Sequence, residues 1–476
     1  MKINTSWLLM LVIALGIILL NFYAFQLPIS TLPSPSESLF PRPIAFHRHS
    51  SPHTVLTPPP SPPLPPTPPP PKQPITKPTP PVQPTVQPQH PLDAPSLDPQ
   101  RKGGCKLTGT APENVVALLV ITCKRPDYLK RSLDGILKYL PSDHKVGDME
   151  YCLIISQDCD ESGIDRLLAT EPYASRISGH IKHPGFLKVP PTGPEYLIEP
   201  KLAAYEAISK HYKWALGQIF DTMKFASAVV LEEDIDVAPD FFEYFSSLIP
   251  ILRQDSSLFC ISAWNDNGFG GVVEDPKALY RTDIFPGLGW ALTRQLWDEL
   301  RDKWARAYWD EFMRLPRIRN RRQCIRPEIS RTYHFGEKGG VSEGQFQPTH
   351  LSRIKINTTP VKWTEMDLTN MLKKRYDADL QQAITESKFI KSPQSLESMT
   401  EKDLTKADGS PMDVKLAYGN EEDFVSIARR YQLMEEWKEK LPRTSYKGVV
   451  VFRFRKARVF LCPNAVAHDP ATLTLL

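Results

Sequence analysis

Three patterns that would assign a chain to a common functional class are missing from this sequence. There is no CxxC pair, which argues against a zinc site, and there is no internal repeat. Lys and Arg number 58 against 54 Asp and Glu, mixed along the chain, so no basic stripe is available to bind nucleic acid. Because the 7 cysteines are an odd number, at least one is free or bridges two chains.

The apolar N-terminal segment is not followed by a convincing small-residue cleavage site. Residues 7–25 are apolar except for Asn21 and nearly reach the roughly 20 residues that cross a bilayer. We therefore predict a transmembrane signal anchor at 7–25 behind a cytosolic tail at 1–6, with a cleaved signal peptide as the alternative. Lys2 and the amino terminus are the only tail cations that support this orientation.

Proline dominates the segment that follows. The chain has 48 prolines, and they crowd residues 28–99, where no core can form and extended polyproline II geometry is favoured. We predict a disordered stem over 26–104 below a lumenal head, the layout of a single-pass type II membrane protein. The lumen permits disulfides, and a glycosylation sequon begins at Asn357.

The head alternates short apolar runs with helical periodicities, which predicts an α/β fold with a mostly parallel sheet. The expected strands are 115–121, 151–155, 226–231 and 258–264, and the expected helices are 129–140 and 201–223. Residues 235–242 are predicted to open a helix with Pro239 in its first turn.

We divide the head into four parts: a catalytic domain at 105–336, a lid loop and linker at 337–371, a smaller α+β domain at 372–466 and a tail at 467–476. The smaller domain has a helical pattern over 424–437 and a predicted hairpin of 448–454 with 457–462. The glycines near 336–342 favour a mobile lid over a site, with a plain surface loop as the alternative.

Three acids, Glu232, Glu233 and Asp234, follow a predicted buried strand and are called the acidic triplet below. Ligands of open α/β sheets bind outside the carboxyl ends of the strands. Carboxylates at that edge suggest a divalent cation, because Mg²⁺ and Mn²⁺ take oxygen ligands and complete their shell with phosphate oxygens and water. The alternative is a solvated acidic turn.

Strand ends also place Arg125 and Asp158 at this edge of the predicted sheet. Arg125 is suited to a phosphate or a base and Asp158 to a uracil or a ribose, while surface salt bridges are the alternative for both. His211 lies beside the apolar face of a predicted helix, where it is either structural or a nucleotide contact.

Glycines bracket Leu288 before a predicted helix, and they would allow the backbone to approach a sugar closely. Farther along, Trp304, Tyr308 and Trp309 surround Asp310 and Glu311. Aromatic rings beside carboxylates are common in carbohydrate sites, where rings cover sugar faces, but they are also common in cores.

Five segments of the head, 230–245, 262–268, 280–290, 325–332 and 442–450, resemble in this order the motifs of the N-acetylglucosaminyltransferase I family, glycosyltransferase family 13. The resemblance implies a GT-A fold. It further implies an inverting enzyme that moves GlcNAc from UDP-GlcNAc to O2 of the α1,3-linked mannose of the Man5GlcNAc2 N-glycan. Mn²⁺ as cofactor and a Golgi membrane location are implied as well.

The resemblance also implies roles for individual residues. Asp234 matches the single protein ligand of Mn²⁺, Glu233 a ribose contact and Glu232 a contact of the donor sugar. Asp310 matches the catalytic base. The remaining matches are nucleotide contacts (Arg125, Asp158, His211), residues near the donor sugar (Leu288, Trp309, Arg322) and the loop that orders over the donor (Val341, Ser342).

The same resemblance implies two disulfides, Cys123–Cys159 and Cys260–Cys324, and leaves three cysteines without partners (Cys105, Cys152, Cys462). Two departures stand out. The family's usual Glu-Asp-Asp is Glu-Glu-Asp here, as in the related enzyme that modifies protein O-mannose, and Gly339-Gly340 adds one residue to the lid loop. Transfer to O-mannose and a non-catalytic lectin or scaffold are therefore the alternative functions.

Overall fold

The computed structural model describes residues 105, 111–185, 195–196, 199, 201–341, 344 and 346–475, all within one compact unit, Val86–Leu476. The predicted tail, anchor and stem lie outside the described residues, as does Ser342 of the lid loop. Within the described ranges, no helix is long and apolar enough to cross a membrane.

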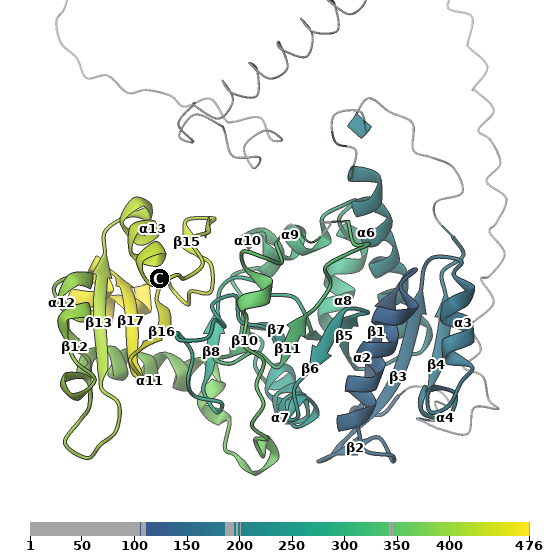
Figure 1. Cartoon of the computed structure of the whole chain (residues 1–476), viewed down its shortest axis with the longest axis horizontal. Coiled ribbons are helices and arrows are strands. Elements are labelled where there is room, and N and C mark those ends of the chain that lie inside the picture. The colour runs from purple at the N-terminus through teal and green to yellow at the C-terminus, as the bar shows by residue number, and fades with distance from the viewer. Residues whose placement is uncertain are drawn as a thin grey trace, which may run out of the picture. The chain divides into compact units, whose positions relative to one another are not determined.

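A nine-stranded sheet organises the first part of the head (Figure 1). Its strand order is β2-β3-β1-β5-β9-β7-β10-β8, with β4 beside β3. The strands are β1 (Val115–Thr122), β2 (Lys145–Val146), β3 (Met149–Gln157), β4 (Gly179–Lys182), β5 (Ser227–Glu232), β7 (Leu258–Ser262), β8 (Leu279–Thr282), β9 (Trp290–Thr293) and β10 (Gln323–Pro327).

The sheet confirms the α/β class and the expected mixed sheet flanked by helices, but parallel pairings do not predominate in it. Strand β1 pairs in parallel with β3 and β5, β3 with β4, and β7 with β10. The other four pairings are antiparallel. Strand β9 pairs in this way with both β5 and β7, β2 pairs with β3, and β8 pairs with β10. The predicted alternation of strands and helices holds as far as β7 and fails where β8 and β9 follow without a helix between them.

Helices cover both faces of the sheet, and alternate residues of β1 face two different cores. Val116 and Leu118 pack in a core with α2 and α7, whereas Ala117 and Leu119 pack in a core with α6 and α8. The helices of this part are α2 (Pro126–Tyr139), α3 (Ser162–Leu168), α4 (Tyr173–Arg176), α6 (Leu202–Gly217) with the π-turn η2 (Gln218–Thr222), α7 (Phe241–Gln254), α8 (Arg294–Leu300), η3 (Arg301–Lys303), α9 (Trp309–Arg314) and α10 (Pro316–Arg319).

The segment after the acidic triplet differs from the prediction. It forms a short strand, β6 (Ile235–Val237), which pairs antiparallel with β11 (Thr332–His334). Ile235 and Val237 are buried while Asp236 between them is partly exposed, an alternation typical of a strand. Helix α7 therefore begins at Phe241, and Pro239 precedes it instead of occupying its first turn.

A second, four-stranded sheet organises the C-terminal part in the order β12-β13-β17-β16. The predicted hairpin is confirmed as β16 with β17, joined by Arg455 and Lys456 at φ 47° and 69°, as a tight two-residue turn requires. The strands are β12 (Lys388–Phe389), β13 (Asp413–Tyr418), β16 (Val450–Phe454) and β17 (Ala457–Pro463).

The predicted helix over 424–437 is observed as α13 (Glu421–Arg430) and is shorter than expected. Gln432 has φ 57°, which ends the helix. Trp437 then lies in a small hairpin of β14 (Trp437–Lys438) with β15 (Leu441–Pro442). The other helices are η4 (Leu351–Arg353), η5 (Trp363–Glu365), η6 (Thr369–Met371), α11 (Lys373–Glu386), α12 (Pro393–Ser398), η7 (Lys402–Leu404), α14 (Asn464–His468) and η8 (Pro470–Leu475).

Three disulfides are present among the described residues. Cys123–Cys159 and Cys260–Cys324 are the predicted pairs. The third, Cys105–Cys152, joins the start of the head to the buried strand β3, and the sequence did not indicate it. Cys462 is a free thiol whose pKa burial raises to about 12, so it stays uncharged at neutral pH.

A buried ion pair connects the start of α7 to the chain after β10. Asp240 Oδ2 accepts hydrogen bonds from Arg331 Nε at 3.1 Å and Nη2 at 3.0 Å, and from Trp363 Nε1 at 2.7 Å. Its Oδ1 accepts one from Asn357 Nδ2 at 2.8 Å. The sequon asparagine is 2% exposed, so in the folded protein its amide serves this network and is closed to glycosylation.

We expect Asp240→Asn to lower the free energy of unfolding by about 3 kcal/mol, because it leaves the Arg331 guanidinium buried without an anionic partner. Chemical denaturation of both proteins measures this. The matched control is Asp236→Asn, which breaks the exposed Arg131–Asp236 pair and should cost less than about 1 kcal/mol. Equal losses in the two variants would contradict the expectation.

Candidate active site

The ends of three parallel strands bring the first group of predicted residues together. In the register, Thr122 at the end of β1 lies opposite Gln157 of β3, and Ile121 lies opposite Glu232 of β5. Arg125, Asp158 and the rest of the acidic triplet follow these strand ends directly. The prediction that they share one edge of the sheet is confirmed.

The acidic triplet is not a solvated turn, since Glu233 and Asp234 are each 4% exposed. Glu233 accepts hydrogen bonds from Arg125 Nε at 2.5 Å, from the backbone N–H of Cys123 at 3.0 Å and from the Thr122 hydroxyl. The guanidinium of Arg125 also donates to Asp234 Oδ2 at 2.8 Å. One arginine therefore binds two of the three acids.

His334, at the end of β11, approaches the same oxygen of Asp234 as Arg125, with its Nε2 3.5 Å from Asp234 Oδ2. Burial opposes ionisation of Asp234, but the hydrogen bond and charge of His334 and the charge of Arg125 outweigh it and lower the pKa of Asp234. Burial also opposes protonation of His334, yet Asp234 raises its pKa. Burial, and then the charge of Asp234, raises the pKa of Glu232.

The surroundings of Asp234 fit a divalent cation. Its Oδ1 is buried and has no hydrogen-bond partner among the described residues, although buried carboxylate oxygens are almost always bound. A Cβ on Gly336 would lie 2.3 Å from Asp234 Oδ2, so only glycine leaves this carboxylate in place. Asp234 is the residue that would hold the ion, and a hard cation with phosphate oxygens suits this oxygen donor.

Asp158 and His211 line the same edge at the end of β3. Asp158 Oδ1 is 2.8 Å from His183 Nδ1, and His211 Nε2 is 2.8 Å from the hydroxyl of Ser156. Burial lowers the pKa of His211 to about 4, so its ring is neutral at neutral pH. No local pattern singles out His183, although its ring centroid lies 5.9 Å from that of His211.

Asp310 belongs to the second group of residues, on α9. Tyr308 before this helix has φ 51°, and the next residue, Trp309, turns into the core and stacks on Tyr212 with ring centroids 4.1 Å apart. Asp310 remains 41% exposed in its side chain and binds Arg314 Nη1 at 2.7 Å. Its carboxylate is therefore held in place and still open to an incoming molecule.

Tyr212 of α6 connects the two groups of residues. Its hydroxyl donates a hydrogen bond to Glu232 Oε1 at 2.6 Å, while its ring stacks on Trp309. Burial raises the pKa of Tyr212 well above its ordinary value, and the charges of Glu232, Asp234 and Asp310 add to the rise. Glu232 of the triplet and Trp309, the neighbour of Asp310 in the chain, thus contact one buried side chain, which brings the two groups of residues together.

The remaining predicted residues are placed in three different ways. The carbonyl of Leu288, a residue at φ 47°, accepts a hydrogen bond from Thr332 Oγ1 at 2.7 Å, directly behind the acidic triplet. Val341 lies in the lid segment, whose Lys338 carbonyl accepts from Arg125 Nη1 at 3.3 Å. Arg322 instead binds Glu299 through two nitrogens at 3.1 and 2.7 Å.

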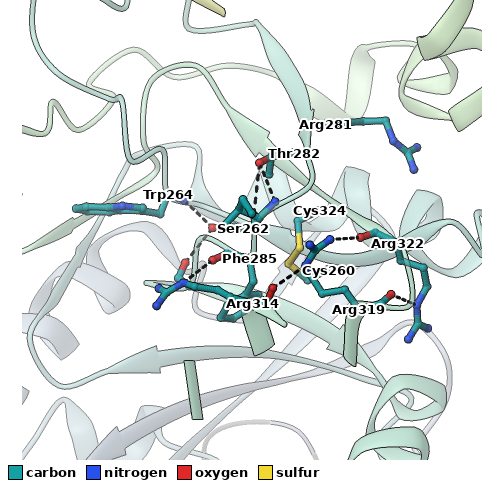
Figure 2. The surroundings of a disulfide bond; sticks show 12 residues. Cys260, Ser262, Trp264, Arg281, Thr282, Phe285, Arg314, Arg319, Arg322 and Cys324 are labelled. Carbon is teal, nitrogen blue, oxygen red and sulfur yellow. Dashed lines mark hydrogen bonds between the residues drawn. A yellow bond between two sulfur atoms is a disulfide. The ribbon is translucent and has the colours of Figure 1, made fainter. Parts of the chain in front are cut away.

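Figure 2 shows the surroundings of the Cys260–Cys324 disulfide, among them Arg314 and Arg319 from the segment between Asp310 and β10. The bond joins β7 to β10. Hydrogen bonds within the segment that precedes β10 then hold Arg314 in position. Arg319 Nε donates to the carbonyl of Arg314 at 3.2 Å, and Arg314 Nε donates to the carbonyl of Phe285 at 3.2 Å. Arg314 is thereby fixed where it can bind Asp310.

A surface cavity of about 720 Å³ lies along α6, η2 and η3, with Lys210, Trp214 and Arg301 among its lining residues. No predicted site residue lines it. Cys123, Asp158 and Cys159 also lie close together, but both cysteines are in a disulfide and their sulfurs are not available to a metal. The acidic triplet and Asp310 therefore define the candidate active site.

Comparisons with known proteins agree with the resemblance of the motifs. The GNT-I family model matches residues 96–471. The alpha-1,3-mannosyl-glycoprotein 2-beta-N-acetylglucosaminyltransferase of Arabidopsis thaliana is 40% identical over 370 residues, which are 77% of this chain and 78% of the relative.

Two solved structures that match this chain have low TM-scores and do not support a function for it. Mouse xyloside xylosyltransferase 1 in its apo form is 12% identical over 52% of this chain and 96% of its own, with a TM-score of 0.28. A mannosyltransferase from Pyrobaculum calidifontis in complex with GDP-Man and Mn²⁺ is 12% identical over 61% of this chain and 68% of its own, with a TM-score of 0.23.

The family model covers both sheets of the head, including the acidic triplet and Asp310. The plant relative matches over more than two thirds of both chains and is 40% identical in sequence. The chain therefore belongs to the GNT-I family of glycosyltransferases.

Proposed function

We propose that this chain transfers GlcNAc from UDP-GlcNAc to O2 of the α1,3-linked mannose of the Man5GlcNAc2 N-glycan, with inversion at the anomeric carbon and dependence on Mn²⁺. The plant relative is named for 2-β-N-acetylglucosaminyl transfer to an α-1,3-mannosyl glycoprotein. The observation that carries the proposal is Tyr212, which contacts both Glu232 and the ring beside Asp310.

Inversion in a single displacement requires a base on the face of the sugar opposite the departing nucleotide. In the proposed mechanism Asp310 accepts the proton of the mannose hydroxyl, since its exposed carboxylate is held by Arg314 at 2.7 Å. A general base of this kind contributes on the order of 10²–10⁴ in rate. A cation held by Asp234 supplies charge neutralisation for the diphosphate.

The other residues of the site bind, orient and exclude water. Arg125, Asp158 and His211 would hold the nucleotide, and Glu233 the ribose. Glu232, Leu288, Trp309 and Arg322 would hold the donor sugar, and Val341 with Ser342 would close over it. Arg125 contacts both the acids and the lid backbone, so closure of the lid would change the contacts of Arg125 with the acidic triplet.

The proposal includes a place in the cell. We propose a Golgi membrane enzyme anchored by residues 7–25, with the proline-rich stem holding the head in the lumen. The apolar run, the 48 prolines and three disulfides support this, because disulfides persist in oxidising compartments.

Transfer of radiolabelled GlcNAc to a five-mannose N-glycan tests the proposed reaction. We expect product with UDP-GlcNAc and Mn²⁺, and none after chelation. An O-mannosyl peptide, offered in parallel, should remain unmodified; modification of the peptide alone would favour the O-mannose alternative. Absence of transfer to either acceptor would favour a lectin or scaffold.

We predict that Asp234→Asn abolishes Mn²⁺-dependent binding of UDP-GlcNAc, because an amide in this position no longer provides an anionic oxygen for the cation. Isothermal titration calorimetry with and without Mn²⁺ measures the binding. Asp236→Asn, two residues away on β6, is the control and should bind like the wild type. Unchanged Mn²⁺-dependent affinity of the Asp234 variant would refute the assignment.

For Asp310→Asn we predict retained binding of UDP-GlcNAc and a loss of transfer of about 10²–10⁴, because the amide cannot accept the proton. Calorimetry and the transfer assay separate the two effects. Transfer within a few-fold of the wild type would show that another residue is the base.

A further inference from the structure

Asp310 is the first member of a chain of charged side chains that leaves the active site. Arg314 Nη1 donates to Asp310 Oδ2 and to Glu311 Oε1, both at 2.7 Å. One nitrogen thus serves two neighbouring carboxylates, which compete for it. The side chain of Arg314 is 8% exposed and its Nε is committed to the carbonyl of Phe285, so it cannot turn to serve both acids separately.

Glu311 has a second cationic partner from a distant part of the chain. Lys438, on the β14–β15 hairpin, donates to Glu311 Oε2 and also to Glu436 Oε1 at 3.3 Å. Two carboxylates, Asp310 and Glu311, are thereby balanced by two cations, Arg314 and Lys438. This balance leaves Arg314 available to Asp310.

The β14–β15 hairpin is itself fixed to the catalytic sheet. Glu436 pairs with Arg443, whose Nε donates to Asp266 Oδ2 at 3.0 Å. Asp266 Oδ1 accepts from the indole of Trp264 at 3.1 Å, in the turn that follows β7. Burial opposes ionisation of Glu436, but Arg443 and Lys438 lower its pKa to about 2, so this anchor is charged at neutral pH.

We propose that Lys438 is a positioning residue for the transfer reaction, acting through Glu311 and Arg314 to hold Asp310 in the orientation that accepts the acceptor proton. The inference rests on the proposed role of Asp310 as base. Without Lys438, Arg314 is the remaining cation bound to Glu311, and Glu311 draws it away from Asp310. A base displaced by even a fraction of an ångström loses rate.

The groups that face this pair of acids come from three elements. Arg314 lies on α9 with the acids, and Lys438 comes from the hairpin. The phenols of Tyr205 and Tyr212 come from α6; burial raises the pKa of both, and the charge of Asp310 adds to the rise. Lys438 and Arg314 are the cations among them. Removal of Lys438 therefore makes the surroundings of the base more negative, which the pH dependence of kcat can report.

The test compares Lys438→Gln with the wild type by steady-state kinetics on the full chain with UDP-GlcNAc, Mn²⁺ and the five-mannose acceptor. We expect kcat to fall roughly tenfold, KM for UDP-GlcNAc to stay the same, and the acid limb of the kcat–pH profile to move to higher pH. Lys438→Arg should restore both quantities, because it keeps the charge.

Two further variants test whether Lys438 acts on Asp310 through Glu311 and Arg314. Lys438→Gln combined with Glu311→Gln should recover most of the lost kcat, since Arg314 then serves Asp310 alone. Arg430→Gln is the matched control: it removes one positive charge from the exposed Arg430–Glu397 pair in the same C-terminal part and should leave kcat and the profile unchanged.

The outcomes separate this inference from the proposed function. Wild-type kcat and profile in Lys438→Gln would overturn the inference, and so would a loss that Glu311→Gln does not relieve. If Asp310→Asn itself retains transfer, the proposed base is wrong, whatever the Lys438 variants show. Loss in Asp310→Asn with no effect of Lys438→Gln would leave the base in place and exclude the positioning role.

Discussion

One guanidinium, that of Arg125, binds two buried carboxylates at the end of the central strands, and the candidate site is arranged around this contact. Burying two neighbouring carboxylates such as Glu233 and Asp234 costs free energy unless a cation binds them. Arg125 provides it from the start of α2, and His334 adds a second positive partner to Asp234 alone. Burial opposes the ionisation of both Asp234 and Glu232, but His334 and Arg125 lower the pKa of Asp234, whereas the pKa of Glu232 is raised, so the acids of the triplet are not equivalent.

Much of this arrangement could be predicted from the sequence, and the exceptions have a common cause. Strand β5 and the acids that follow it are local patterns, and so are the hairpin of β16 with β17 and the amphipathic helix α6. The short strand β6 was missed because it exists only through pairing with β11, about a hundred residues later. Helix α13 was predicted too long because apolar residues continue past the left-handed Gln432.

The site residues also divide into those that local sequence patterns predict and those that only tertiary contacts identify. The acidic triplet, Arg125 and Asp158 follow strand ends, so a correct sheet already brings them together. His334 and Tyr212 carry no local signal of a site: one ends an edge strand and the other lies on the apolar face of a helix. Their roles appear only when the distances to Asp234 and Glu232 are known. The same holds for Cys105 and Cys152, whose pairing no spacing in the sequence indicates.

The two halves of the site differ in rigidity in a way that suits glycosyl transfer. Asp234 is buried, bound by two cations and confined by Gly336, as expected where a small ion and a diphosphate must be placed accurately. Asp310 is largely exposed and relies on Arg314 for its orientation. A base that must receive a branched glycan cannot be enclosed, so its alignment has to come from fixed charges behind it. The ion pairs that run from Arg314 through Lys438 and back to Asp266, after β7 of the catalytic sheet, are placed to supply that alignment.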